Sequence, residues 1–139
     1  MALDTEVAGE VQRELTVFAR RVRALSARLH PELPFVAYSM LSHIQAEGGC
    51  RSVDLVAVYR LDKSTVSRQI ADLARRGLVD RSPDPAGGRG QMLTVTSAGA
   101  ALLEEAARRQ RAELDRRLAD WTPAEAAEFA RLLRRYNGD

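Results

Sequence analysis

The stretch Leu61-Asp62-Lys63-Ser64-Thr65-Val66-Ser67-Arg68-Gln69-Ile70 predicts a helix with one buried face and one polar face. Asp62 is a good N-cap, because its carboxylate can accept from the backbone N–H groups of the first turn that have no partner within the helix. Gly77 supplies a stop after Arg76. Apolar residues recur at four- and three-residue spacing and give the helix an inward stripe, formed by Val66, Ile70 and Leu73.

The opposite face of this helix carries short or forked hydrogen-bonding groups, namely Ser64, Thr65, Arg68, Gln69 and Asp72. A helix about 10 Å across fits the major groove of B-DNA. Arginine and glutamine have paired donors and acceptors that match the edges of guanine and adenine. An ordinary amphipathic surface helix would show the same pattern, so the flanking sequence has to separate the two interpretations.

The residues before this stretch predict a second, shorter helix. Ser52 is expected to cap it, and Leu55, Val56 and Val58 give it an apolar face. The four residues 59–62 then make the turn into the next helix. This arrangement is a helix-turn-helix, in which the second helix enters the major groove.

The residues after it predict a winged hairpin. Two short strand-like runs, 78–81 and 91–96, flank the Pro- and Gly-rich loop 82–90. Arg89 lies near the tip of this loop. An arginine on such a loop is suited to the minor groove beside the major-groove site, where narrow A/T-rich stretches concentrate negative potential.

The segment DKSTVSRQIADLARRGLVDRSPDPAGGRGQMLTVTSAG, residues 62–99, resembles the MarR family of bacterial transcriptional regulators. The resemblance implies a mainly α chain with a small β-wing, in which a winged helix-turn-helix is embedded in an all-helical homodimer. It also implies binding of double-stranded operator DNA, usually as a repressor, and release by a small phenolic or anionic effector. Carried over by position, Ser64, Thr65, Arg68 and Gln69 face bases and Arg89 is the wing arginine; Lys63 and Arg75 complete the predicted DNA-binding set.

Two positions depart from the family pattern. The family usually has an acid two residues before the wing arginine, where this chain has Gly87, so the ion pair expected to orient Arg89 is missing. A glycine often ends the first helix of the motif, where this chain has Arg60. Either the turn differs there, or a non-glycine residue adopts an unfavourable backbone angle.

Composition is that of a small regulator. The 139 residues carry a net charge of +2, and 45% of them are apolar. Residues 62–92 contain six basic and four acidic side chains, so the excess positive charge lies in the helix and wing. This balance favours a few placed phosphate contacts over indiscriminate coating of nucleic acid. No apolar run is long enough for a bilayer and no signal peptide is evident, so we expect a cytoplasmic protein.

The two ends of the chain predict a dimer. Helical apolar stripes comprise Val7, Val11, Leu15, Phe18, Val22, Leu25 and Leu29 before Pro31, and Leu102, Leu103, Ala106, Leu114, Leu118, Phe129, Leu132, Leu133 and Tyr136 near the C-terminus. A small winged domain could not cover so much apolar surface, which favours a twofold homodimer over a monomer. We therefore divide the chain by role into a dimerisation helix (1–33), a DNA-binding lobe (34–96) and C-terminal dimerisation helices (97–139).

Other chemistry is sparse. His30, His43 and Cys50 lack the spacing of a metal site, and no catalytic pattern is present, so we expect no metal, no cofactor and no enzyme activity. The resemblance places an effector in the crevice between the dimerisation and DNA-binding parts, and Phe18, Met40 and His43 are the tentative lining residues. Two alternatives stay open: a redox switch at Cys50, whose pKa the neighbouring Arg51 could lower, and a DNA-binding factor without an effector.

Overall fold

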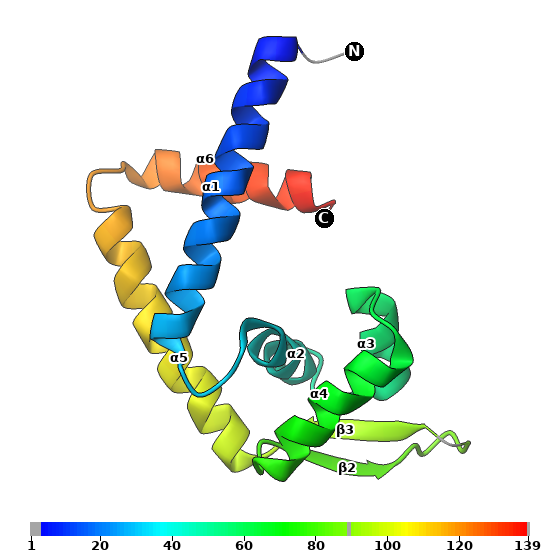
Figure 1. Cartoon of the computed structure of the whole chain (residues 1–139). Coiled ribbons are helices and arrows are strands. Elements are labelled where there is room, and N and C mark those ends of the chain that lie inside the picture. Colours follow the sequence, from blue (N-terminus) through cyan, green and yellow to red (C-terminus); the bar gives the residue numbers. More distant parts are fainter. Residues whose placement is uncertain (1–3, 89, 139) are drawn as a thin grey trace. The chain divides into compact units, whose positions relative to one another are not determined.

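The computed structural model describes residues 4–88 and 90–138. The described elements are α1 (Thr5–Leu29), α2 (Phe35–Ala46), β1 (Cys50–Arg51), α3 (Ser52–Tyr59), α4 (Lys63–Arg75), β2 (Val79–Pro83), β3 (Gln91–Val95), α5 (Ser97–Arg117) and α6 (Pro123–Asn137), labelled in Figure 1. The chain forms two compact units, residues 1–106 and 107–139. The predicted class, mainly α with a small β-wing, is confirmed; the three-part division by role stays a prediction.

The predicted helix-turn-helix is present as α3 and α4. Asp62 caps α4, accepting from the backbone N–H of Thr65 at 2.6 Å, and Gly77 follows the helix with φ +73°. The inward stripe of α4 is buried as predicted, with Val66, Ile70 and Leu73 at most 3% exposed. The turn between the helices is made by Arg60 in the left-handed region (φ 51°, ψ 31°). Of the two alternatives for this position, the structure therefore shows a non-glycine residue with an unfavourable backbone angle.

The sheet has one strand more than the sequence predicts. β1 pairs with β3 and gives an antiparallel order β1-β3-β2, in which Cys50 faces Leu93. Because Arg51 belongs to this strand and is extended, it becomes the N-cap of α3, and Ser52 is the first helical residue. The expectation that Ser52 caps α3 is therefore wrong. The Asp54 carboxylate accepts from the Arg51 backbone N–H at 3.0 Å instead.

The core of the first unit lies between the winged motif and α2. Its buried members are Leu33, Ala37, Met40, Leu41, Ile44, Cys50, Leu55, Val66, Ile70, Leu73, Leu78, Val79 and Leu93. In Figure 1, β2 and β3 run side by side as a hairpin beside α4. The hairpin and α4 share this core, so burial of the inward stripe fixes the polar face of α4 relative to the wing.

The corner between α1 and α2 is closed by His30, which is 4% exposed. Its ring contacts the Ser26 hydroxyl through Nε2 at 2.9 Å and the Leu33 carbonyl through Nδ1 at 3.2 Å. It also stacks on Tyr38, with the ring centroids 3.7 Å apart. Both ring nitrogens thus have protein partners, which explains why this histidine is buried without being a metal ligand.

The second unit contains the turn from α5 into α6. The predicted capping box is confirmed: Thr122 Oγ1 accepts from the backbone N–H of Glu125 at 3.2 Å, and Glu125 Oε2 accepts from that of Thr122 at 2.8 Å. Trp121 packs edge-on against Phe129, with the ring centroids 5.4 Å apart. Phe129, Leu132 and Tyr136 of α6 are each at least 41% exposed in the isolated chain.

Candidate nucleic-acid interface

The polar face of α4 carries most of the side chains assigned to DNA. Lys63, Ser64 and Arg68 are exposed, whereas Thr65 and Gln69 are half-buried beside the inward stripe. Arg68 Nη2 donates to Thr65 Oγ1 at 3.2 Å, which holds the guanidinium over the first turn of the helix. The Arg68 side chain is therefore more accessible than that of Gln69, and base contacts by either residue stay a prediction.

Asp62 organises the first turn of α4. Its Oδ1 accepts from the Ser64 hydroxyl at 2.7 Å in addition to the Thr65 backbone N–H. These hydrogen bonds lower the pKa of Asp62 from 3.8 to about 2, and the one from Ser64 has the largest effect. Because the hydroxyl hydrogen of Ser64 is committed to Asp62, Ser64 presents an acceptor to the outside. An acceptor suits the amino groups of adenine and cytosine.

The C-terminal turn of α4 carries a small charge cluster. Arg75 Nη2 and Arg76 Nε both donate to the Asp72 carboxylate, Arg76 at 2.9 Å. Arg76 Nη1 also donates to the Glu32 carbonyl at 2.6 Å and so joins α4 to the α1–α2 corner. Arg75 is exposed, and a DNA contact by Arg75 stays a prediction. In such a contact, a phosphate would compete with the Asp72 carboxylate for the guanidinium N–H groups of Arg75.

The wing is organised around Asp84. Asp84 Oδ1 accepts from the Ala86 backbone N–H at 3.0 Å, and the Asp84 carbonyl accepts from the Gly87 N–H at 2.9 Å. Gly87 and Gly88 both have positive φ, at 87° and 90°, a conformation that L side chains rarely adopt. The predicted wing arginine, Arg89, lies outside the described residues.

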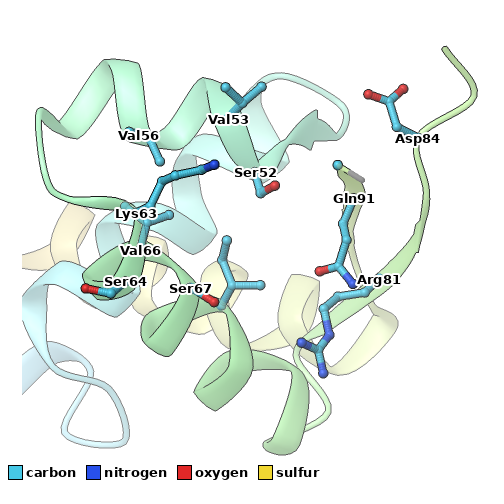
Figure 2. A pocket seen from close by; sticks show the side chains of 12 residues that line it. Ser52, Val53, Val56, Lys63, Ser64, Val66, Ser67, Arg81, Asp84 and Gln91 are labelled. Carbon is cyan, nitrogen blue, oxygen red and sulfur yellow. The ribbon is translucent and has the colours of Figure 1, made fainter. Parts of the chain in front are cut away.

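A groove of about 730 Å³ lies between α3, the start of α4 and the two wing strands. Figure 2 shows the side chains that line it, among them Lys63, Ser64 and Ser67 of α4, Arg81 of β2, Gln91 of β3, and Val53 and Val56 of α3. Two predicted DNA-binding residues, Lys63 and Ser64, thus share one surface with side chains from the wing.

Several residues of this groove were missed by sequence reasoning: Ser52, Ser67, Arg81 and Gln91. Ser67 follows Ser64 by one turn and was available from helical spacing. Whether Arg81 and Gln91 line the groove depends on the register of β2 and β3, which pairs Arg81 with Leu93 and Pro83 with Gln91. No local pattern in the sequence determines that register.

The three tentative effector residues lie in different surroundings. Phe18 is 54% exposed on α1, and Met40 is fully buried in the core. His43 lines a second hollow of about 600 Å³ with Cys50, Val58 and Met92, and its ring lies edge-on to that of Tyr59. An effector contact by Phe18, Met40 and His43 stays a prediction.

Cys50 does not have the environment of a reactive thiol. It is 7% exposed, and burial raises its pKa, with further increases from the nearby carboxylates of Asp54 and Glu47. The guanidinium of Arg51 is directed to Asp54 and Asp84, with N–O distances of 3.7 Å. This raised pKa is opposite to the lowering expected from Arg51, and a redox switch at Cys50 stays a prediction.

Two further findings concern the described residues alone. In residues 4–88 and 90–138, no three His, Cys, Asp or Glu side chains come together as a metal site would require. The helices described there include none with a stretch long and apolar enough to cross a bilayer.

Comparison with known proteins agrees with this geometry. Residues 32–90 match the model of the MarR family. The chain is 33% identical over 129 residues to YxaD of Bacillus subtilis, an uncharacterised HTH-type transcriptional regulator, and the match covers 91% of this chain and 90% of YxaD.

Two solved structures are similar over nearly the whole chain. One is a mutant MarR from E. coli complexed with operator DNA, with a TM-score of 0.74, 25% identity, and coverage of 98% of this chain and 99% of that chain. The other is from work on the regulation of DNA binding of Bordetella bronchiseptica BpsR by 6-hydroxynicotinic acid, with a TM-score of 0.74, 28% identity, and coverage of 92% and 98%.

Proposed function

This chain belongs to the MarR family of DNA-binding transcriptional regulators, and on that premise we propose that it represses transcription by binding a palindromic operator as a homodimer. Its relatives are transcriptional regulators and not enzymes. Since its target is chromosomal DNA, we place it in the cytoplasm of a bacterium. The observation that carries the proposal is α4, whose inward stripe is buried while its polar face stays open.

Base reading is assigned to the outward face of α4, led by Arg68. Its guanidinium is exposed and held over the first turn, where Ser64 and Thr65 stand beside it. Bidentate contacts of arginine to guanine or of glutamine to adenine are each worth roughly 1–3 kcal/mol of discrimination. Lys63 and Arg75 supply phosphate contacts on the same helix, and Arg89 is assigned to the minor groove.

The homodimer is supported by exposed apolar side chains on α1 and on α6. Val7, Val11 and Phe18 of α1 are at least 45% exposed, and α6 exposes Phe129, Leu132 and Tyr136. Partner helices that cover such stripes would remove them from water. A twofold dimer also presents two α4 helices to one face of DNA, about 34 Å apart for half-sites separated by one turn.

Regulation is assigned to a small phenolic or anionic effector. The similarity to BpsR, whose DNA binding is regulated by 6-hydroxynicotinic acid, supports this chemical class. Phe18, Met40 and His43 remain the candidate contacts. Because Met40 is fully buried, an effector that touches it must open the packing between α2 and the rest of the core.

One experiment tests operator reading. Selection of bound sequences from random DNA supplies the operator, and binding is then measured to it and to a scrambled duplex. Arg68→Ala should weaken operator binding by roughly 1–3 kcal/mol and leave scrambled DNA much less affected. Equal losses on both duplexes would make Arg68 a phosphate contact and contradict the assignment.

A second experiment tests the dimer. Val11→Glu places a charge on the exposed apolar stripe of α1 and should weaken dimerisation by about 3 kcal/mol without unfolding the chain. Gln12→Glu adds a carboxylate at the next, also exposed, position and serves as the control. Sedimentation velocity at micromolar concentration should show a dimeric wild type; a monomeric wild type contradicts the proposal.

A further inference from the structure

We infer that Arg76 is a positioning residue, which holds the end of α4 against the corner between α1 and α2 and so sets the separation of the two reading helices in the dimer. This inference rests on the dimeric DNA-binding function proposed above. It adds to that function a residue that acts without touching DNA, through the placement of α4.

The guanidinium of Arg76 joins two parts of the chain that are far apart in sequence. Its Nε donates to the Asp72 carboxylate at 2.9 Å, one turn back on α4. Its Nη1 donates to the Glu32 carbonyl at 2.6 Å. Hydrogen bonds from a charged donor are stronger than neutral ones, and the planar fork of arginine can hold two acceptors at once. We call the bond from Arg76 to the Glu32 carbonyl the brace.

The corner that accepts the brace, residues 30–34, is stiff enough to serve as an anchor. It contains two prolines, whose rings restrict the φ angle. The buried ring of His30 contacts Ser26 of α1 and the Leu33 carbonyl. The same ring stacks on Tyr38 of α2. The corner thus fixes α1 and α2 to each other, and the brace adds α4.

The placement of α1 depends on this corner. Among the described residues of α1, Ser26 near its C-terminal end is the buried one, whereas α2, α3, α4 and the strands contribute the buried core. Close packing in a core fixes the elements that contribute to it. Because α1 contributes so little, the polar contacts at the corner set its direction relative to α4.

α5 is attached beside the same end of α4. Thr96, which precedes α5, donates from Oγ1 to the Gly77 carbonyl at 2.6 Å and from its backbone N–H to the Leu78 carbonyl at 3.1 Å. Both α1 and α5, which are assigned to the dimer, are thus linked to the C-terminal end of α4. The attachment through Thr96 remains when the brace is lost, so removal of Arg76 should loosen α4 and not unfold the chain.

The reading residues lie at the other end of α4, where a small change of angle has its largest effect. Arg68 is about 12 Å along the helix from Arg76. A displacement of about 1.7 Å in each protomer changes the separation of the reading residues by about 3.4 Å, which is one base-pair step. Loss of the brace should therefore let the dimer accept half-sites that are one base pair closer or farther apart.

Binding to the selected operator, and to operators with one base pair added or removed between the half-sites, tests this role. The wild type should lose on the order of a hundredfold in affinity on the altered operators, because only one half-site can then be read. Arg76→Gln should bind the selected operator on the order of tenfold more weakly than the wild type. Its further loss on the altered operators should be about tenfold or less, and its salt dependence should equal that of the wild type.

Arg75→Gln is the matched control. Arg75 donates to the same Asp72 carboxylate, and among the described contacts the Glu32 carbonyl is bonded by Arg76 and not by Arg75. Because Arg75 is assigned to phosphate, its loss should make the slope of log affinity against log salt less steep by about 0.9 per contact and keep the wild-type preference for spacing. The same pattern in Arg76→Gln would make Arg76 a phosphate contact and overturn the inference.

Arg76→Lys serves as a second variant if Arg76→Gln folds poorly in urea denaturation. It retains the charge but lacks the planar fork, so it should show the same relaxed spacing. A wild-type preference for spacing in the folded variants would also overturn the inference.

A measurement without DNA separates a failure of the brace from a failure of the proposed function. Arg68→Cys, in a chain whose single cysteine is removed by Cys50→Ala, carries one spin label on each α4 of the dimer. Double electron–electron resonance should give a broader distance distribution when Arg76→Gln is added. An unchanged distribution contradicts the brace even if the operator is read. A broadened distribution in a protein without operator preference supports the brace and contradicts the DNA-binding proposal.

Discussion

Arg51 and Asp84 join the start of α3 to the base of the wing. Arg51 Nη1 lies 3.7 Å from Asp84 Oδ2. The other carboxylate oxygen of Asp84 accepts from the Ala86 backbone N–H. The backbone N–H of Asp84 donates to the Gly90 carbonyl at 3.3 Å. The acid that the family places at position 87 is absent, and this pair restrains the wing at its base instead of at its tip.

The first prediction concerns this ion pair. Arg51→Gln and Asp84→Asn should each increase amide hydrogen exchange in the wing and weaken operator binding, because the wing must then be ordered on DNA. The double variant should lose little more than either single one, as expected for a shared interaction of about 0.2–1 kcal/mol. Asp80→Asn, which removes an exposed carboxylate on β2, is the control. Additive losses would mean that the two residues act independently.

The second prediction concerns the backbone at Arg60. A non-glycine residue in the left-handed region costs roughly 1–2 kcal/mol relative to glycine, partly offset by the greater freedom of glycine in the unfolded chain. Arg60→Gly should therefore raise the free energy of unfolding by about 0.5–1 kcal/mol, whereas the β-branched Arg60→Val should lower it by about 1 kcal/mol. Urea denaturation measures both, and a destabilised Arg60→Gly protein would contradict the strain argument.

The third prediction concerns Gly99 at the start of α5. A Cβ at this position would clash with the Leu78 carbonyl oxygen, so there is no room for it. Gly99→Ala should lower the free energy of unfolding by about 1–3 kcal/mol. Gly9→Ala is the matched control, because a Cβ there meets only the end of the Arg13 side chain and alanine favours helix. Equal effects on the thermal midpoint would exclude the close contact at Gly99.

The fourth prediction concerns pH and the cap of α4. The pKa of Asp62 is lowered from 3.8 to about 2, so its charge contributes stability that is present above pH 3.8 and is lost as the pH falls toward 2. Asp62→Asn keeps a capping group without a charge. Wild type should exceed Asp62→Asn in unfolding free energy at pH 6, and the difference should shrink between pH 4 and pH 2. A difference that does not vary with pH would show that the charge is not responsible.

Much of the interface followed from local pattern. The spacing of Val66, Ile70 and Leu73 predicts the buried face of α4, and the remaining positions follow from helical geometry. Asp62 and Gly77 mark the ends of the helix because caps and stops are local chemistry. The same holds for Thr122 and Glu125 at the start of α6.

The sequence by itself thus determined the helices, the wing and the polar face of α4, since each depends on residues a few positions apart. Only the tertiary structure decided what depends on long-range register: the third strand, the transfer of the α3 cap from Ser52 to Arg51, and the groove that Lys63 and Arg81 both line. It also decided the state of Cys50. Arg51 is its neighbour in sequence, yet burial and the carboxylates of Asp54 and Glu47 set the thiol pKa, because electrostatic effects follow distance in space and the exclusion of water.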